Sequence, residues 1–352
     1  MSARSVLSAL DPDKYEITQI GITKEGVWLT GENILETLSK GQLDDKNLNQ
    51  VVIIPDQYHN RVWEIQNKES TWNLVPMKNV DVVFPVLHGT FGEDGTLQGL
   101  LELADLAYVG AGVTGSAVGM DKGIFKDVMR ANNIPTTPSV IVLRSEIEKH
   151  VQIVIKQAEA VAPYPLFVKP ANLGSSVGIT KCNSKSDLGE GLMEAATYDR
   201  RVLVERGVNA REIEVSVLGN DVPIASVPGE VLPSREFYSY ESKYIDGTSG
   251  LVIPAQLPTG ITENIRQMAV TAYKAIDCSG MARVDFFVEK GTDEIYLNEI
   301  NTIPGFTSIS MYPKLWEASG ISYPQLVDRL VELAIERKVD RDHTERSFRR
   351  IP

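Results

Sequence analysis

Cysteine is scarce in this chain of 352 residues, which contains only Cys182 and Cys278. Two cysteines cannot form a disulfide framework, so we expect reduced thiols and a cytoplasmic protein. The four histidines are scattered along the chain, which argues against a zinc site. No apolar run approaches the roughly 20 residues that a membrane-spanning helix needs. The segment from Met1 to Asp13 does not resemble a signal peptide, because its apolar stretch is short and interrupted by serines.

Basic residues are also fewer than acidic ones. The 35 lysines and arginines are outnumbered by 47 aspartates and glutamates, which gives a formal net charge of -12. This balance argues against nucleic acid or an anionic membrane as a partner. A small anionic substrate would need local basic residues, so lysines in apolar or glycine-rich surroundings become candidates. The length predicts two or three domains.

The segment from Arg283 to Ser310 has the pattern of a β-hairpin. The residues from Arg283 to Val288 favour strand, the turn-forming sequence KGTD follows, and Glu294 to Ile300 runs back. Because side chains alternate along a strand, Arg283 shares a face with Asp285, and Glu299 shares one with Asn301. If the two strands pair, these four polar groups converge.

Two interpretations of this convergence remain open. Oxygen ligands with only two formal charges suit Mg²⁺, which takes its remaining ligands from water and phosphates. The alternative is a solvated, charged face of an ordinary hairpin. Apolar neighbours of Asp285 and Glu299 favour the metal, because carboxylates in apolar strands are costly unless paired or metal-bound.

Ahead of the hairpin, the apolar run from Asp81 to Leu87 predicts a buried parallel strand. It leads into a glycine-rich polar loop from His88 to Gly95, and Thr96 to Ala104 has helical periodicity. Ligands bind at the carboxyl ends of such strands in open α/β sheets. His88 is therefore a candidate ligand contact, with a capping or core histidine as the alternative. Tyr108 to Gly119 is expected to be a connector.

The middle of the chain contains a lysine in apolar surroundings. Asp121 is expected to cap a helix from Lys122 to Asn132, and Lys169 ends the apolar strand from Pro165 to Pro170. The small-residue loop from Ala171 to Ile179 follows. Its backbone N–H groups could bind phosphate oxygens, or it could be a plain hairpin turn. It lacks the Lys-Ser/Thr ending of a Walker A loop. A buried Lys169 would need a phosphate or a carboxylate as partner.

Two further segments carry polar groups, one in the pattern of a strand and one in the pattern of a long loop. Arg211 to Val217 alternates and places Glu212, Glu214 and Ser216 on one face of a strand. Arg235 to Pro254 is a long polar segment with three tyrosines and Lys243, which favours a lid that closes over a site, with a mobile surface loop as the alternative. Further helices are expected at Met1–Leu10, Ile147–Ala162, Asp187–Ala196, Ile261–Ala275 and Tyr323–Ile335.

Six motifs occur in a fixed order along the chain: HGTFGEDGTLQG, MDK, VKPANLGSSVG, VERGVNAREIEV, FYSYESKY, and ARVDFF followed by LNEINTIPGFTSIS. From Ser2 to Leu333 the chain thereby resembles the D-alanine–D-alanine ligases of the ATP-grasp fold. The resemblance implies an α/β protein of three domains. These are an N-terminal parallel α/β domain for the first substrate (1–121), a small central α+β domain (122–208) and a C-terminal catalytic α+β domain with a mixed sheet (209–352).

The resemblance also implies roles for individual residues. Lys122 and Lys169 match the lysines that bind the ATP phosphates, and Ser175 and Ser176 match a loop that covers them. Contacts to the adenine and ribose are implied for Glu205, Val208 and Glu212. Asp285, Glu299 and Asn301 match the ligands of two Mg²⁺ ions, which Mn²⁺ could replace, and K⁺ is a further candidate ion. Arg283 and the N–H of Gly305 match oxyanion donors. The substrate contacts implied are His88, Glu93, Lys243, Ser310 and Met311.

Two departures from the family pattern matter. The family normally begins with a strand and a glycine-rich turn that carries a glutamate and a serine, whereas this chain starts within the helix that follows. We therefore expect either an incomplete N-terminus or the loss of part of the first-substrate site. Ser175 and Tyr244 match two members of a Glu–Ser–Tyr trio whose glutamate is the missing one. The segment from Gly31 to Val80 is longer than in the shortest members, which affects no catalytic residue.

The activity implied is ATP-dependent joining of two D-alanines through an acyl phosphate, for peptidoglycan precursors, by a cytoplasmic homodimer. Tyr244 favours D-alanine as second substrate, because a neutral phenol does not repel an incoming ammonium group as a protonated imidazole would. One alternative is a related ligase that uses D-serine or D-lactate. Another is a protein that binds Mg-ATP but turns over poorly.

Overall fold

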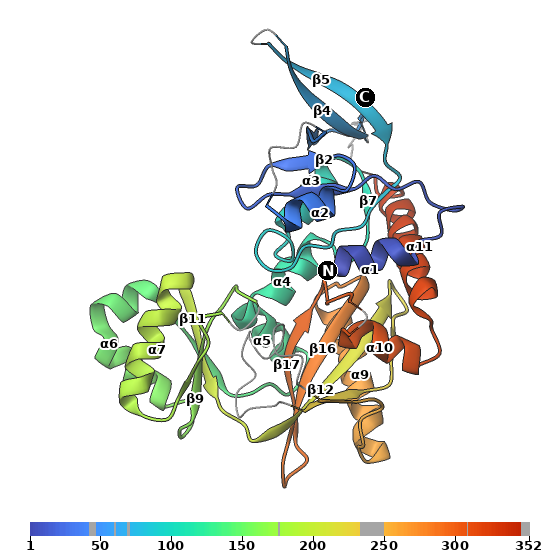
Figure 1. Cartoon of the computed structure of the whole chain (residues 1–352). Helices are drawn as coiled ribbons and strands as arrows, with labels where there is room; N and C mark the ends of the chain where they lie inside the picture. Colours follow the sequence, from blue (N-terminus) through green and yellow to red (C-terminus); the bar gives the residue numbers. More distant parts are fainter. Residues whose placement is uncertain are drawn as a thin grey trace, which may run out of the picture.

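The computed structural model of the chain describes residues 1–41, 47–59, 61–68, 71–174, 177–232, 250–307 and 309–345. The described strands form a five-stranded, a two-stranded, a four-stranded and a six-stranded sheet, in that order along the chain. In Figure 1 the four-stranded sheet and its helices form a separate lobe at the left of the body that holds the six-stranded sheet.

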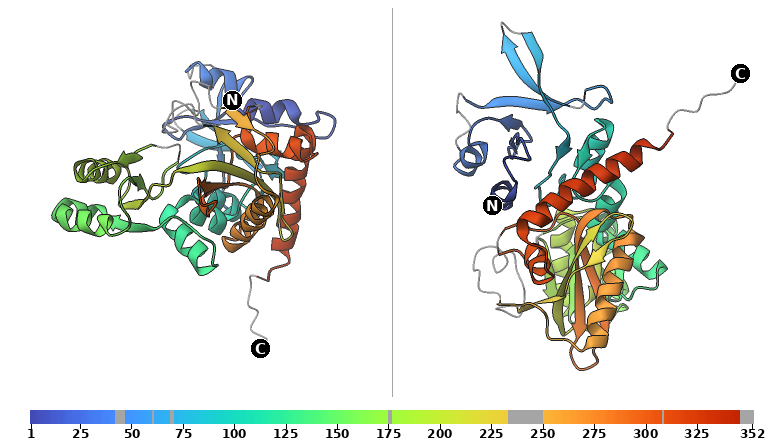
Figure 2. Two further views of the ribbon diagram at one scale, coloured as in Figure 1. Left: turned by 90° about the horizontal axis from the view of Figure 1, so that it is seen from below. Right: turned by 90° about the vertical axis from the view of Figure 1, so that its right-hand side faces the viewer.

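The N-terminal sheet is antiparallel, with the strands in sequence order. It consists of β1 (Ile20–Ile22), β2 (Trp28–Thr30), β3 (Asn49–Ile53), β4 (Arg61–Lys68) and β5 (Thr71–Asn79), accompanied by helices α1 (Ser2–Ala9) and α2 (Ile34–Ser39). The β4–β5 hairpin projects away from the rest of the molecule, as Figure 1 and the right-hand view of Figure 2 show. The expected parallel N-terminal domain is therefore wrong for these strands, because the connections between most of them are too short for a crossover.

Among the residues described in this region, parallel pairing is confined to β6 (Val82–Val83) and β7 (Ala107–Tyr108), joined through helix α3 (Thr96–Leu103). The predicted strand from Asp81 to Leu87 is thus confirmed in direction but is short. The predicted connector from Tyr108 to Gly119 is wrong, because Val113–Met120 forms helix α4. Its small residues allow close packing: a Cβ on Gly115 would lie 3.0 Å from the carbonyl oxygen of Asp277.

The central lobe contains a four-stranded antiparallel sheet in the order β10-β9-β11-β8. Asp121 caps the helix that precedes this sheet as expected, since its carboxylate accepts from the N–H groups of Gly123 (3.0 Å) and Ile124 (2.9 Å). The apolar residues of that helix pack into the core of the six-stranded sheet. The elements are α5 (Lys122–Ala131), β8 (Ser139–Leu143), α6 (Arg144–Glu159), β9 (Leu166–Pro170), β10 (Thr180–Cys182), α7 (Lys185–Tyr198) and β11 (Arg201–Arg206). Residues of α6 and α7 pack with the sheet into one apolar core.

The six-stranded sheet follows the order β15-β14-β12-β16-β17, with β13 beside β12. Helix α9 covers one face of this sheet, and α10 and α11 contribute to the core on the other face. The elements are β12 (Ala210–Gly219), β13 (Ile224–Ala225), β14 (Gly229–Leu232), β15 (Gly250–Val252), α9 (Thr259–Ala275), β16 (Gly280–Glu289), β17 (Ile295–Asn301), α10 (Met311–Ala318) and α11 (Tyr323–Asp342).

The pairings between these strands are all antiparallel. The mixed sheet that was expected here is thus limited to one parallel bridge between Thr136 and Leu297. Each of the three predicted domain ranges contains its own sheets, and the boundaries between the domains stay a prediction. None of the described helices is long and apolar enough to cross a membrane.

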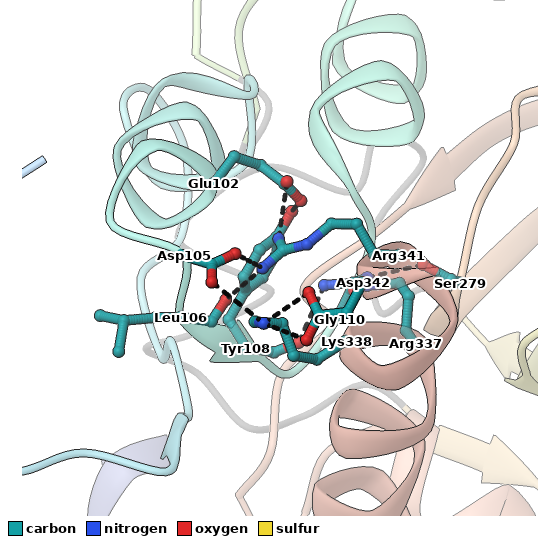
Figure 3. A network of polar contacts seen from close by, with 10 residues as sticks. All are labelled: Glu102, Asp105, Leu106, Tyr108, Gly110, Ser279, Arg337, Lys338, Arg341 and Asp342. Carbon is teal, nitrogen blue, oxygen red and sulfur yellow. Dashed lines mark hydrogen bonds and ion pairs between the residues drawn. The ribbon is translucent and has the colours of Figure 1, made fainter. Parts of the chain in front are cut away.

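The last turns of α11 clamp the segment between α3 and α4 (Figure 3). The guanidinium of Arg337 donates to the carbonyl oxygens of Tyr108 (2.9 Å) and Gly110 and to the hydroxyl of Ser279 (2.6 Å). Arg341 pairs with Glu102 of α3 (2.6 Å) and with Asp105, which follows α3 (3.1 Å). These contacts join the chain that leaves the N-terminal region to the start of β16.

Replacing Arg337 with methionine should lower the free energy of unfolding by about 2–4 kcal/mol, because charged hydrogen bonds to two carbonyls are lost. Urea denaturation measures this change. The matched control is Arg329→Met on the same helix, whose exposed pairs with Glu332 and Glu336 should contribute less than about 1 kcal/mol. Equal effects of the two substitutions would contradict a clamping role.

Candidate active site

The predicted hairpin forms, and its polar side chains converge on one face of the six-stranded sheet. Across β16 and β17, Arg283 lies opposite Asn301 and Asp285 lies opposite Glu299. On the other side of β16, Glu214 of β12 lies opposite Asp285. Because directly opposed residues of antiparallel strands share a face, one cation, three carboxylates and an amide are brought together.

A β-bulge in β17 makes this arrangement compatible with the core. The pairing shifts between Asp285 and Phe286, so that Glu299 and Leu297 face consecutive residues of β16 and Asn298 is the extra residue. Strict alternation would put Leu297 on the face of Glu299. The bulge instead lets both Leu297 and Ile300 enter the core beneath α9, while Glu299 stays with the polar group.

Arg283 is held by two carboxylates. Its Nε and Nη2 atoms donate to the two oxygens of Asp285, each at 2.7 Å, and Nε lies 3.0 Å from Oε2 of Glu214. Burial alone would lower the pKa of Arg283, but the charges of Asp285 and Glu214 outweigh it and raise the pKa well above its ordinary value. The guanidinium is therefore a fixed, permanent positive charge at the site.

The oxygen donors on this face fit a divalent cation in number and type. Asp285, Glu299 and Asn301 supply hard oxygen ligands from two paired strands, and Asn301 accepts the N–H of Ile303 through Oδ1 (3.1 Å). Within the described ranges, no group of three or more histidine, cysteine, aspartate or glutamate side chains could hold a metal alone. A cation here would need additional ligands, as phosphates or water provide.

The loop after β6 reaches this face from the N-terminal region. His88 approaches the carbonyl oxygen of Ile303 through Nδ1 (3.0 Å) and Oγ of Ser2 through Nε2 (3.4 Å). Burial lowers the pKa of His88. The carboxylate of Glu93 accepts the N–H of Gly89 and lies within electrostatic reach of Glu299 and Arg283. Both residues that were predicted to contact substrate in this loop therefore lie near Arg283.

The pH dependence of stability can test whether the Glu93 side chain is buried. Only 8% of the residue is exposed, and burial raises the pKa of its carboxyl to about 7 from the usual 4.5. Between pH 4.5 and 7 the folded chain binds more protons at Glu93 than the unfolded chain. The stability from this group is thus complete below the lower value and is lost as pH rises through the upper one.

Denaturation across this pH range should therefore show a steeper loss of stability for the wild type than for Glu93→Gln. The two slopes should differ by up to about 1.4 kcal/mol per pH unit, the value for one proton. Glu317→Gln, at an exposed position of α10, is the control and should keep the wild-type slope. Parallel curves for the wild type and Glu93→Gln would show that Glu93 is not buried.

Lys169 at the end of β9 has the carboxylate partner that its apolar surroundings demand. Glu205 of β11 pairs with Lys169 and, at 2.9 Å, with Lys126 of α5. Burial alone would raise the pKa of Glu205, but the two lysines hold it well below its ordinary value. Burial opposes charge on Lys169 too, but Glu205, Glu299 and Glu212 outweigh it and raise its pKa. Lys169 thus lies within electrostatic reach of the polar face of the C-terminal sheet.

The remaining predicted nucleotide contacts come from α5, from β12 and from the connection between β11 and β12. Lys122 at the start of α5 donates from Nζ to the carbonyl oxygen of Leu173 (2.6 Å), in the loop that follows β9. Glu212 lies on β12 opposite Phe287, and Val208 lies in the connection between β11 and β12. Because the carboxylate of Glu205 is used by the lysines, any adenine contact by this residue would have to come from its backbone.

The predicted second-substrate residues Ser310 and Met311 lie where α10 begins, after the loop that follows β17. Oγ of Ser310 accepts the N–H of Thr307 (3.0 Å), and a Cβ on Gly305 would approach that Oγ to 2.8 Å. The side chain of Met311 packs with Val231 and Leu315 in an apolar cluster. Met311 can therefore offer a polar contact only from its backbone. Ser175, Ser176, Lys243 and Tyr244 lie outside the described residues, as does most of the expected lid.

Two buried residues near Lys169 have no sequence signal that singles them out. Lys126 follows Lys122 by one helical turn and resembles any lysine of an amphipathic helix. Thr137 lies in an irregular segment before β8. Their connection to Glu205 depends on pairing between segments about 70 residues apart, which a local pattern does not reveal.

Comparison with protein families gives two matches that together span nearly the whole chain. A family model described as D-ala D-ala ligase N-terminus matches residues 1–111, and one described as D-ala D-ala ligase C-terminus matches residues 128–332. A D-alanine–D-alanine ligase of Acetivibrio thermocellus is 48% identical over 347 residues, covering 97% of this chain and 92% of that protein. The corresponding protein of Caldicellulosiruptor bescii is 49% identical, covering 96% and 91%.

Solved structures agree with the sequences. The D-alanine–D-alanine ligase of Coxiella burnetii superposes with a TM-score of 0.81 at 38% identity, covering 97% of this chain and 90% of that one. The VanG D-Ala:D-Ser ligase of Enterococcus faecalis gives 0.83 at 37% identity, covering 95% and 94%. The predicted ATP-grasp fold is thereby confirmed. With both family models and relatives at nearly half identity in agreement, the chain belongs to the D-alanine–D-alanine ligase family.

Proposed function

We propose that the protein joins two D-alanine molecules to D-alanyl-D-alanine at the expense of ATP. The observation that carries this proposal is the convergence of Arg283, Asp285, Glu299 and Asn301 on one face, within reach of Lys169 from the central lobe. Ligases of this kind must bring phosphates, a divalent cation and a reacting carboxylate together. This face supplies the cation ligands and the positive charge of Arg283, and Lys169 adds a second positive charge.

In this reaction a carboxylate becomes reactive only after it accepts a phosphoryl group, because a free carboxylate is a poor electrophile. Lys169 and Lys122 are proposed to bind the phosphates and to keep them in line with the first D-alanine. Arg283 and the N–H of Gly305 are proposed to stabilise the negative charge that develops on the acyl oxygen when the second amine attacks. The anchored Arg283 suits this role because it needs no rearrangement as the charge appears.

Asp285, Glu299 and Asn301 are proposed to hold the divalent cation, which would neutralise the phosphate charges during transfer. Mg²⁺ is the proposed ion, in two copies, with Mn²⁺ as a substitute and K⁺ as an additional ion. Asp285 would have to share its oxygens between Arg283 and the cation. Glu214 would then keep Arg283 in place.

The first D-alanine is proposed to bind beside the loop that carries His88 and Glu93. Ser310 and the backbone of Met311, with Lys243, are proposed to contact the second. A homodimer in the cytoplasm is the proposed form of the enzyme. Both described cysteines are free thiols, as a reducing compartment favours.

Incubation of the purified chain with ATP, Mg²⁺ and either D-alanine alone or D-alanine with D-serine or D-lactate tests the proposal. The expected product is D-alanyl-D-alanine with one phosphate released per dipeptide, detected by mass spectrometry. The VanG relative makes D-serine a second candidate for the incoming substrate. Predominant D-alanyl-D-serine or depsipeptide would move the chain to that activity, and phosphate release without any product would refute ligation.

A further inference from the structure

We propose that Lys126 is a positioning residue that acts through Glu205, so that Lys169 keeps a net positive charge for the phosphates of the nucleotide. This inference rests on the proposed function, since it concerns how one of the phosphate-binding lysines is prepared. It assigns a role to a side chain that does not itself reach the substrate.

The side chains of the cluster are deeply buried. The side chain of Lys126 is 1% exposed and that of Glu205 is 3% exposed, with 2.9 Å between Nζ and Oε2. Nζ of Lys126 also donates to Oγ1 of Thr137 (2.7 Å), which in turn donates to Oε2 of Glu205 (2.9 Å). One carboxylate oxygen is thus fully occupied by Lys126 and Thr137.

The other oxygen of Glu205 points to Lys169. Lys169 contacts Oε1, and its side chain, at 11% exposed, is the most exposed of the three charged groups. Lys169 is also the member of the cluster whose pKa responds to Glu212 and Glu299 on the facing sheet. The cluster therefore presents its charge to the nucleotide site through Lys169.

The charges of the cluster do not balance internally. Burial lowers the pKa of Lys126, and the neighbouring Glu205 opposes that shift. With both lysines protonated, two cations share one carboxylate, which leaves a surplus of one positive charge at the end that faces the site. Without Lys126, Glu205 would be a full counter-ion for Lys169, and the pair would be neutral. Stability alone does not account for a buried triad of this kind, because well-packed apolar residues are often as stabilising. Its presence is better explained by the charge that it leaves on Lys169.

The test uses nucleotide binding, which does not require dipeptide synthesis. Titration calorimetry with ADP and with adenosine separates phosphate contacts from base and ribose contacts. Lys126→Met should weaken ADP binding about tenfold, equivalent to ~1.4 kcal/mol, and change adenosine binding less than about twofold. The KM for ATP should rise by a similar factor while the KM for D-alanine stays near the wild-type value. Lys156→Met, at an exposed position of α6, is the control and should match the wild type.

A second variant separates charge from packing. In the double variant Lys126→Met with Glu205→Gln, Lys169 again has no full counter-ion, so ADP affinity should return to within about threefold of the wild type. A purely structural role predicts the opposite, namely equal losses for ADP and adenosine and no recovery in the double variant. If Lys126→Met alone does not fold, a tenfold loss of ADP affinity in the double variant overturns the proposal. Failure of the wild type to make dipeptide would instead refute the proposed function.

Discussion

Replacing Arg283 with methionine is expected to lower kcat by about 10²–10³-fold, the usual cost of losing one donor to a developing oxyanion. The guanidinium is fixed by Asp285 and Glu214 at 2.7–3.0 Å, so its position is set before substrate arrives. The substitution also leaves two carboxylates without their cation. We therefore expect a loss of stability of about 3–5 kcal/mol in the same variant.

Steady-state kinetics at saturating ATP and D-alanine measure the first effect, and urea denaturation measures the second. The matched control is Arg211→Met, which removes an arginine of the neighbouring strand that pairs with Glu230 (2.6 Å). This control should keep kcat within about threefold of the wild type, since Arg211 lies on the face of β12 opposite to Glu212 and Glu214. A variant at Arg283 that retains wild-type kcat would exclude Arg283 from the reaction.

Replacing Glu299 with glutamine should abolish the dependence of nucleotide binding on magnesium and lower activity by about 10²-fold or more, because a cation supplies several kcal/mol of charge stabilisation. Glu299 lies opposite Asp285 and near Lys169 and Glu93. It therefore interacts electrostatically with charged groups from both the N-terminal region and the central lobe. Its loss should affect the cation more than the protein core, since it lies on the face opposite to Leu297 and Ile300.

Calorimetric titration of ADP with and without Mg²⁺ measures this dependence directly. The wild type should bind ADP at least tenfold more tightly with Mg²⁺, and Glu299→Gln should show little difference. Glu289→Gln is the control on the same hairpin, because Glu289 pairs with Arg206 (3.2 Å) at the far end of β16, four residues beyond Asp285. Unchanged magnesium dependence in Glu299→Gln would show that this face is not the metal site.

The hairpin was predictable because its information is local. Alternation along β16 and β17 decides which residues share a face, and the KGTD turn decides that the strands meet. Because Lys169 lies in an apolar strand, the sequence predicts that its charge has a partner. The structure identifies this partner as the carboxylate of Glu205. Local pattern does not say which carboxylate it is, because β9 and β11 are adjacent only through the order of the sheet.

Other features depend on contacts that the pattern does not encode. Helix α4 looks like a connector because Gly115 and Gly119 have low helix propensity, but the close approach of Asp277 and Thr302 requires such small residues. The parallel N-terminal domain was implied by the family resemblance, and the apolar run from Asp81 to Leu87 predicted only one parallel strand. Short turns between the N-terminal strands instead produce antiparallel pairing. The role proposed for Lys126 could not be predicted from local pattern either, because it depends on Glu205, which lies far along the chain.

The extra residue in β17 links folding to chemistry. A slip of one position in the pairing of β17 with β16 would turn Leu297 and Ile300 toward the charged face and push Glu299 toward the apolar side beneath α9. The misaligned state would therefore lose hydrophobic burial and desolvate an acid at the same time. Selection for a stable hairpin is thus sufficient to keep the proposed metal ligands aligned, even in conditions where the enzyme is idle and its activity is not under selection.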